Sequence, residues 1–299
     1  MTSGNGRDAN QTLRAQSMDG KVVLITGANR GVGLEAARGL ARRGANVVLV
    51  CRDPERGGIA KDEVAKVATG KGPTLLIADL SSQAEIRVLA NTVCTRFKRI
   101  DVLLNNAGAM FAHRELTTEG IEKTFAINHL APFLLTNLLL DLVRETPESR
   151  IITVTSESHS GTLDFDNLQG ERKYNFFGAY NSSKLGNILF TYELARRLEG
   201  SDVTANCVSP GPSDTRFGDD MKGFPGLFLR LIKHIPFLLA TAEKGASTLI
   251  YGASSPELAG SSGRFFLRCH ERRTKRISYN VDVAKRLWKV SERLCGQAT

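Results

Sequence analysis

The sequence predicts one α/β domain built on a doubly wound parallel sheet. Short apolar segments alternate along the chain with segments of helical spacing, and the apolar segments are continuously apolar. Continuous apolar strands are typical of a parallel sheet that helices cover on both faces. The expected strands are residues 21–26, 45–50, 74–78, 101–104, 150–155 and 203–208, with helices over 34–43 and 85–97 among the segments between them.

The domain is expected to span residues 19–299, because no internal repeat and no Pro- or Ser-rich linker divides it. Residues 1–18 are polar and lack periodicity, which predicts a flexible tail. Two segments interrupt the alternation of strands and helices: the polar residues 157–177 and the apolar, proline-interrupted residues 217–240. Both follow strand ends, where open α/β sheets bind ligands. We expect both to form walls of a substrate pocket.

Composition excludes several classes of protein. The hydrophobic content of 41% and charged content of 24% are ordinary for a soluble globular chain. No apolar run reaches 18 residues and the start lacks an apolar core, so neither a transmembrane segment nor a secretory signal is expected. The five cysteines form no CxxC pair and the histidines do not cluster, so we expect no metal site and a reducing, cytoplasmic location.

The net charge of +9 indicates a basic surface that attracts a phosphate-rich cofactor. Nucleic-acid binding is disfavoured, because no basic stretch is interleaved with aromatic residues. The densest basic run, residues 268–276, is also compatible with contact to an anionic membrane surface. Peripheral membrane contact through residues 217–240 stays open, since pocket helices and interfacial helices look alike in sequence.

A glycine-rich turn joins the first strand to the first helix, in the stretch Thr26-Gly-Ala-Asn-Arg-Gly-Val-Gly33. A tight turn here needs the conformational freedom of glycine, and glycines leave no side chain between backbone and ligand. The N–H groups at the helix start then face a pyrophosphate. The residues expected to line this dinucleotide site are Gly27, Asn29, Arg30, Gly31, Val32 and Gly33.

The end of the second strand favours NADP(H) over NAD(H). An NAD-binding enzyme places a carboxylate there for the ribose 2′-hydroxyl, whereas this chain has Arg52, whose guanidinium suits a 2′-phosphate. Asp53 follows directly and weakens the argument. Arg30 is either a second phosphate contact or a solvated surface arginine. Further cofactor contacts are expected at later strand ends, from Asp79 and Leu80 near the adenine and from Asn106, Ala107 and Gly108.

Tyr180 and Lys184 are four residues apart, so they lie on one face of a helix. A neighbouring ammonium lowers the pKa of a phenol, which would suit Tyr180 to exchange a proton with a carbonyl or an alcohol. Ser156 ends the fifth strand and is expected to bind the substrate oxygen. Asn128 lies in a helical segment and is a candidate to bind a proton-relay water. Ser-His-Asp hydrolysis through Ser156 and His159 is disfavoured, because the chain has no G-x-S-x-G elbow.

Taken together, these motifs resemble the short-chain dehydrogenase/reductase family. The stretches that carry the resemblance are TGANRGVG, DL, NNAG, Asn128, Ser156, Tyr180-x-x-x-Lys184 and Pro210-Gly211, in the family's order. The resemblance implies a Rossmann-type sheet of about seven strands and homo-oligomers. It implies Tyr180 as acid/base, Lys184 as its pKa modulator and ribose ligand, Ser156 as substrate ligand and Asn128 as holder of a relay water. Pro210, Gly211 and Thr215 are expected near the nicotinamide.

Within that family the chain looks most similar to the retinol dehydrogenase-like branch, through ANRGVGLEAARGLARRGANVVLVCRD, DNLQGERKY and AYNSSKLGNILF. The resemblance implies hydride transfer between NADP(H) and a lipophilic aldehyde, ketone or alcohol. We expect an apolar pocket walled by Phe111, Phe176, Phe177 and residues 217–240. Two alternatives are weighed: an NADP(H)-binding sensor without turnover, and a sugar-nucleotide epimerase of the extended branch. The retained Tyr180 and Lys184 disfavour the first, and the form of the glycine turn disfavours the second.

Overall fold

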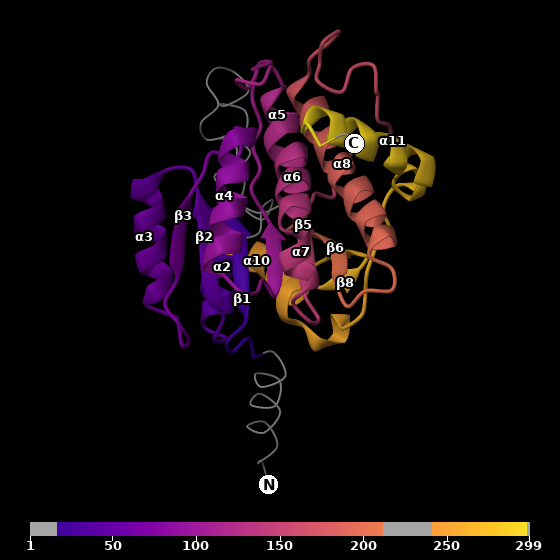
Figure 1. The fold of residues 1–299 in the computed structure, drawn as a ribbon. Coiled ribbons are helices and arrows are strands. Elements are labelled where there is room, and N and C mark those ends of the chain that lie inside the picture. Colours follow the sequence, from indigo (N-terminus) through magenta and orange to yellow (C-terminus); the bar gives the residue numbers. More distant parts are fainter. Residues whose placement is uncertain (1–16, 212–240, 298–299) are drawn as a thin grey trace.

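The computed structural model describes residues 17–211 and 241–297 (Figure 1). Thr215 and the expected pocket segment 217–240 lie outside the described residues, as does nearly all of the expected N-terminal tail. The last residue of that tail, Met18, is buried, and its N–H donates to the carbonyl of Arg43 at 2.7 Å. Met18 is thus packed against the domain, although composition placed it in the tail.

One mixed sheet organises the fold, in the order β3-β2-β1-β4-β5-β6-β7-β8. All neighbouring strands are parallel except β8, which pairs antiparallel with β7. The six strands expected from the sequence are confirmed. The strands are β1 (Val22–Thr26), β2 (Asn46–Cys51), β3 (Thr74–Ile77), β4 (Val102–Asn105), β5 (Arg150–Val154), β6 (Thr204–Ser209), β7 (Phe265–Leu267) and β8 (His270–Glu271).

The sheet has one strand more than the expected seven, because a tight hairpin adds β8. Arg268 and Cys269 connect β7 to β8, with φ angles of 50° and 62°. Two consecutive positive φ values match the twist of a two-residue hairpin turn. Spacing alone did not predict this hairpin, since β7 and β8 are too short to show a hydrophobic period.

Helices cover both faces of the sheet, as the continuously apolar strands predicted. One face carries α2 (Gly31–Ala41), α3 (Pro54–Ala65) and α10 (Ala242–Ser254). The other carries α4 (Gln83–Arg96), α6 (Ala131–Leu138), α8 (Phe176–Arg197) and α11 (Val281–Leu294), of which α4, α6 and α8 stand in front of the strands in Figure 1. Within β1, Leu24 joins the core on one face while Val23 and Ile25 join the core on the other. Alternate residues are thus buried on opposite sides, so every position is apolar.

Shorter helical pieces complete the layer on the α6 side. The chain passes without a break through α5 (Lys123–Phe125), the π-helical segment η1 (Ala126–Leu130) and α6, and α7 (Leu140–Arg144) follows. The 3₁₀ turns η2 (Pro256–Leu258) and η3 (Arg276–Tyr279) flank the β7–β8 hairpin in the sequence. The C-terminal helix α11 packs on α8, with the Trp288 ring 4.9 Å from Phe133 and 5.7 Å from Phe190.

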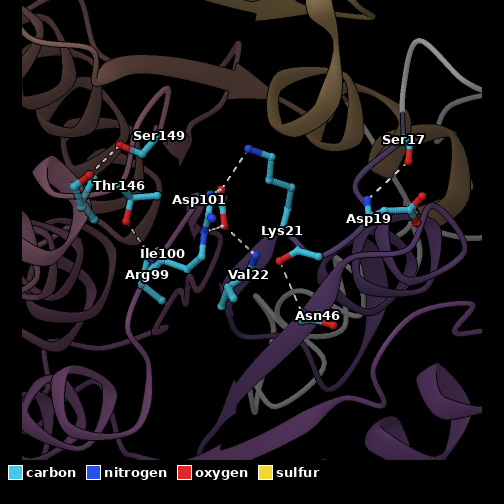
Figure 2. Close-up of polar contacts among 12 residues, drawn as sticks. Ser17, Asp19, Lys21, Val22, Asn46, Arg99, Ile100, Asp101, Thr146 and Ser149 are labelled. Atoms are coloured by element: carbon cyan, nitrogen blue, oxygen red, sulfur yellow. Dashed lines mark hydrogen bonds and ion pairs between the residues drawn. The ribbon is translucent and has the colours of Figure 1, made fainter.

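A buried carboxylate ties β1 to β4 at the amino-terminal edge of the sheet (Figure 2). Asp101 is 4% exposed and accepts hydrogen bonds from the N–H of Val22 at 2.8 Å and from Nε of Arg99 at 2.9 Å. Lys21 adds an ion pair at 3.2 Å. These contacts hold the two central strands in register and leave the opposite, carboxyl edge to form the site.

Candidate active site at the carboxyl edge of the sheet

The turns after β1 and β4 are joined by hydrogen bonds. The hydroxyl of Thr26 accepts from the N–H groups of Asn106 at 2.9 Å and Ala107 at 3.0 Å. In return, the side chain of Asn106 donates to the carbonyls of Thr26 at 2.8 Å and Gly27 at 3.1 Å. Thr26 was not singled out in the sequence, although it ends the strand that enters the turn. The two loops expected to flank a dinucleotide therefore form one rigid unit.

Two glycines of the turn make room for the protein itself. Gly27 has a φ of +66°, and a Cβ there would lie 2.9 Å from Cα of Ala107. A Cβ on Gly33 would lie 2.4 Å from Nδ2 of Asn106 and 2.5 Å from the carbonyl oxygen of Gly27. Gly33 thus allows α2 to pack on the joined loops, and its expected role beside a ligand stays a prediction. Gly31, with φ of +57°, starts the helix.

The start of α2 is suited to an anion. Its N-cap residue, Arg30, makes no side-chain capping hydrogen bond, and the first helical turn of α2 contains no acidic residue. The first N–H groups of a helix lack partners within the helix and carry the positive end of its dipole. Together with the glycine turn, this helix start has the features of a pyrophosphate site.

Arg52 and Asp53 differ in their surroundings at the end of β2. Arg52 is exposed directly after the strand. Asp53 is the N-cap of α3, and its Oδ1 accepts the N–H of Arg56 at 3.0 Å. The carboxylate is thus engaged by its own helix, while the Arg52 side chain is exposed.

The turn after β3 is shaped by its own side chains. Oδ1 of Asp79 accepts from the N–H of Ser81 at 2.9 Å and from its hydroxyl at 2.8 Å. Leu80 is partly buried against the core. Both residues lie at the same edge as the glycine turn, because β3 is parallel to β2 and β1.

Ser156, Tyr180 and Lys184 come together beyond the end of β5. The N-cap Asn175 starts α8 by accepting the N–H of Gly178 at 2.8 Å, and α8 then carries both Tyr180 and Lys184. The ammonium of Lys184 is buried, donates to the carbonyl of Val154 at 3.2 Å and lies 5.5 Å from the ring centroid of Tyr180. The hydroxyl of Tyr180 is hydrogen-bonded to Ser156.

Burial shifts both titratable groups of this cluster away from their charged forms. It raises the pKa of Tyr180 to about 12, with the Ser156 hydrogen bond acting in the opposite direction. It lowers the pKa of Lys184 to about 8. The contribution that opposes burial at Tyr180 is the Ser156 hydrogen bond, so the expected lowering of the Tyr180 pKa by Lys184 stays a prediction. A phenol with a raised pKa stays protonated at neutral pH and can donate its proton.

Asn128 sits in η1 and is fully buried. Its Oδ1 accepts the N–H of Ala109 at 2.7 Å, and its Nδ2 donates to the Ala109 carbonyl and to the hydroxyl of Ser183, both at 2.9 Å. Both N–H bonds of the amide are thus used by the protein, and the expected binding of a relay water stays a prediction. Ser183, which the sequence reading missed, lies three residues after Tyr180 and donates to its carbonyl at 2.7 Å.

The expected pocket walls are placed only in part. Phe176 and Phe177 begin α8 with ring centroids 4.2 Å apart, and Phe177 is 40% exposed. Phe111 follows the joined loops, with the ammonium of Lys123 5.6 Å from its ring centroid. A cavity of about 850 Å³ lies at the opposite edge of the sheet and includes none of the expected site residues in its lining.

Two residues that the sequence placed near the nicotinamide, Pro210 and Gly211, directly follow β6. Pro210 and Gly211 leave the strand toward the same edge, and the N–H of Gly211 donates to the hydroxyl of Ser209 at 3.2 Å. A Cβ on Gly211 would lie 3.8 Å from the side chain of Leu267.

Comparison with known proteins agrees with this geometry. The family model for short-chain dehydrogenases matches residues 21–223, which include every expected site residue up to Thr215. The chain belongs to the short-chain dehydrogenase family. It is an oxidoreductase of the retinol dehydrogenase-like branch, and its family binds nicotinamide cofactors.

The relatives support the branch over nearly the whole chain. Retinol dehydrogenase 11 of Homo sapiens is 41% identical over 283 residues, covering 93% of this chain and 87% of that protein. Retinol dehydrogenase 13 of Homo sapiens is 39% identical, covering 94% and 86%.

Solved structures show the same fold. An uncharacterized protein from Mycobacterium paratuberculosis superposes with a TM-score of 0.76 at 31% identity, covering 94% of this chain and 96% of that one. RhlG of Pseudomonas aeruginosa, solved as an NADP active-site complex, gives a TM-score of 0.67 at 25% identity, covering 85% of this chain and 96% of that one.

Among the described residues, no helix is both long enough and apolar enough to cross a membrane.

Proposed function

We propose that this protein is an NADPH-dependent carbonyl reductase, reversible as an alcohol dehydrogenase, that acts on apolar aldehydes and ketones of the retinal type. The observation that carries the proposal is the cluster of Ser156, Tyr180 and Lys184 at the same sheet edge as the glycine turn. The names of the relatives support retinoid-like substrates, and the RhlG complex supports NADP.

The cofactor site fits a nucleotide with a 2′-phosphate. The uncapped start of α2 and the left-handed Gly31 would hold the pyrophosphate, and Arg52 would pair with the 2′-phosphate, while Asp53 is engaged by α3. Asp79, Leu80 and the backbone of residues 106–108 would border the adenine side and the middle of the cofactor. Bound there, the cofactor supplies the hydride.

The protein's own residues supply the proton and orient the substrate oxygen. Tyr180 donates its phenolic proton to the carbonyl oxygen as hydride reaches the carbonyl carbon. Ser156 donates a hydrogen bond to the same oxygen, since a hydroxyl keeps a donor and a second lone pair after accepting the N–H of Ser158 at 3.0 Å. The ammonium of Lys184, 5.5 Å from the ring centroid of Tyr180, would stabilise the phenolate that the transfer leaves behind.

The decisive test removes the phenolic hydroxyl alone. We expect Tyr180→Phe to lower kcat for the reduction of all-trans-retinal by about 10²- to 10⁴-fold, the usual value of a general acid. The variant should still bind NADPH, which can be measured by the change in NADPH fluorescence. The matched control is Tyr192→Phe on the same helix, whose hydroxyl contacts Thr274 at 3.2 Å. Turnover by Tyr180→Phe at the parent rate would overturn the assignment.

Turnover also separates the enzyme from a sensor. The parent protein is expected to oxidise NADPH in the presence of all-trans-retinal and nonanal, and to do so faster than it oxidises NADH. Tight NADPH binding without turnover of either aldehyde would favour a sensor that reports NADPH occupancy.

A further inference from the structure

We propose that His159 is a positioning residue for Ser156: its imidazole fixes the main chain of the serine so that the hydroxyl meets both Tyr180 and the substrate oxygen. This inference rests on the proposed function, because it assigns His159 a role through Ser156. His159 lies in the loop that leaves β5 and is 7% exposed.

The imidazole is held between two main-chain groups that fix its tautomer. Its Nδ1 lies 3.1 Å from the carbonyl oxygen of Ser156, which can only accept a hydrogen bond. Its Nε2 accepts the N–H of Lys275 at 3.3 Å. The ring proton must therefore reside on Nδ1, and a neutral His159 satisfies both partners at once.

The loop around His159 is held on both sides. The ammonium of Lys275 donates to the carbonyl of His159 at 2.5 Å, and the N–H of His159 donates to the carbonyl of Glu157 at 3.1 Å. The ring also faces Phe265 of β7, with centroids 6.5 Å apart. Lys275 is the charged group that faces the imidazole, and burial lowers the pKa of His159, with Lys275 adding to that effect. The ring is thus kept neutral at neutral pH.

The same loop orients the serine hydroxyl. Ser156 Oγ accepts the N–H of Ser158 at 3.0 Å, and the hydroxyl of Ser158 donates to Oδ1 of Asn181 at 2.9 Å. Asn181 adjoins Tyr180 on α8, and its carbonyl accepts the N–H of Ser160 at 3.0 Å. Ser156 is therefore set between α8 on one side and the segment before η3 on the other. Without the bond from His159, its carbonyl loses the anchor that comes from the second side.

Lys275 and His159 are 116 residues apart in the sequence. The bond to Lys275 therefore makes the geometry of Ser156 depend on the segment between β8 and η3. A rotation of the peptide after Ser156 would displace the Ser158 N–H that holds the serine hydroxyl. Misplacement of a reacting group by about 1 Å can cost 10²-fold in rate.

Two amide substitutions separate positioning from packing. In His159→Asn, the side-chain Nδ2 can take the place of the imidazole Nδ1 and donate to the Ser156 carbonyl. In His159→Gln, the longer amide reaches the Lys275 N–H instead, and the Ser156 carbonyl loses its hydrogen bond from residue 159. We expect His159→Asn to keep kcat for all-trans-retinal within about threefold of the parent value. We expect His159→Gln to lower kcat about 10- to 30-fold. The KM for NADPH should be unchanged in both variants. If His159 served only to fill space, the smaller Asn would be the more impaired variant.

The experiment is completed by a double-mutant cycle and a matched control. In a Ser156→Ala background, His159→Gln should lower kcat no further, because the two residues act through one hydroxyl. His270→Gln is the control, since Nδ1 of His270 also lies near a carbonyl, that of Arg268 at 2.7 Å, but on the exposed β8 hairpin. We expect this control to match the parent.

The outcomes distinguish this inference from the proposed function. If Ser156→Ala retains the parent rate, the proposed role of Ser156 fails, and that of His159 fails with it. If Ser156→Ala is impaired but His159→Gln equals the parent, or lowers kcat equally in both backgrounds, only the positioning role is overturned.

Discussion

The amide of Asn128 holds the main chain of Ala109 at both of its polar groups, accepting the N–H at 2.7 Å and donating to the carbonyl at 2.9 Å. With these two hydrogen bonds, the Asn128 side chain pairs with the main chain of Ala109 as a neighbouring β-strand would. It fixes the segment that follows the β4 loop relative to η1, and the bond to Ser183 extends this connection to α8. Three parts of the site thus share one buried amide.

This arrangement predicts that a carboxylate cannot replace Asn128. In Asn128→Asp, two donors are lost and a buried oxygen faces the Ala109 carbonyl, which should cost about 1–3 kcal/mol of stability and lower kcat at least tenfold. Thermal unfolding and retinal reduction measure both effects. Asn137→Asp is the matched control, because that amide also donates to a carbonyl, that of Phe133 at 2.8 Å, away from the site. Equal activity of the two variants would contradict the prediction.

Arg52 is expected to set the preference for NADPH. In Arg52→Ala, kcat/KM for NADPH should fall about 10- to 100-fold, since a charge-assisted hydrogen bond contributes about 1.5–3 kcal/mol. The value for NADH should hardly change, because NADH lacks the 2′-phosphate. Arg42→Ala at the far end of α2 serves as the control for a general loss of positive charge. Parallel losses with both cofactors would show that Arg52 does not read the phosphate.

The pH dependence of reduction should follow Lys184. Burial lowers its pKa to about 8, so the ammonium is present below that pH and lost above it. We therefore expect kcat/KM for NADPH, which reports the free enzyme, to fall as the pH rises through about 8. In any Lys184→Arg variant that retains activity, this decline should disappear, because a guanidinium stays charged. A parent profile that stays flat up to pH 10 would refute this role of the ammonium.

The Asp101 carboxylate should stabilise the fold without touching the chemistry (Figure 2). Burial alone would raise its pKa, but hydrogen bonds from Arg99, the Val22 N–H and Lys21 outweigh this and hold the pKa below its usual value. Its contribution is therefore present at neutral pH and lost as the pH falls through the folded-state pKa.

Asp101→Asn tests this contribution by thermal unfolding at several pH values. We expect a loss of about 1–3 kcal/mol at pH 7 and a smaller difference from the parent in acid. The exposed Asp202→Asn is the control, and kcat per folded molecule should stay at the parent value. A difference that stays undiminished down to the most acidic pH at which the parent remains folded would mean that packing, and not the charge, explains the loss.

The local parts of this site could be predicted because they depend on short-range periodicity. Continuous apolar strands, the glycine turn after β1 and the four-residue spacing of Tyr180 and Lys184 are each contained within a few consecutive residues. Such patterns encode backbone conformation and the face on which a side chain lies. The sequence by itself therefore determined the sheet, the place of the glycine turn and the pairing of phenol with ammonium.

Tertiary structure decided what each side chain contacts. Asn128 meets Ser183 across 55 residues, and His159 meets Lys275 across 116. No local period records such pairs, because they form only when distant segments pack. Burial, which raises the pKa of Tyr180 and lowers that of Lys184, is likewise a property of the assembled layers. The chemical groups could be identified from the sequence. Their partners and protonation states depend on the fold, because folding removes these groups from water.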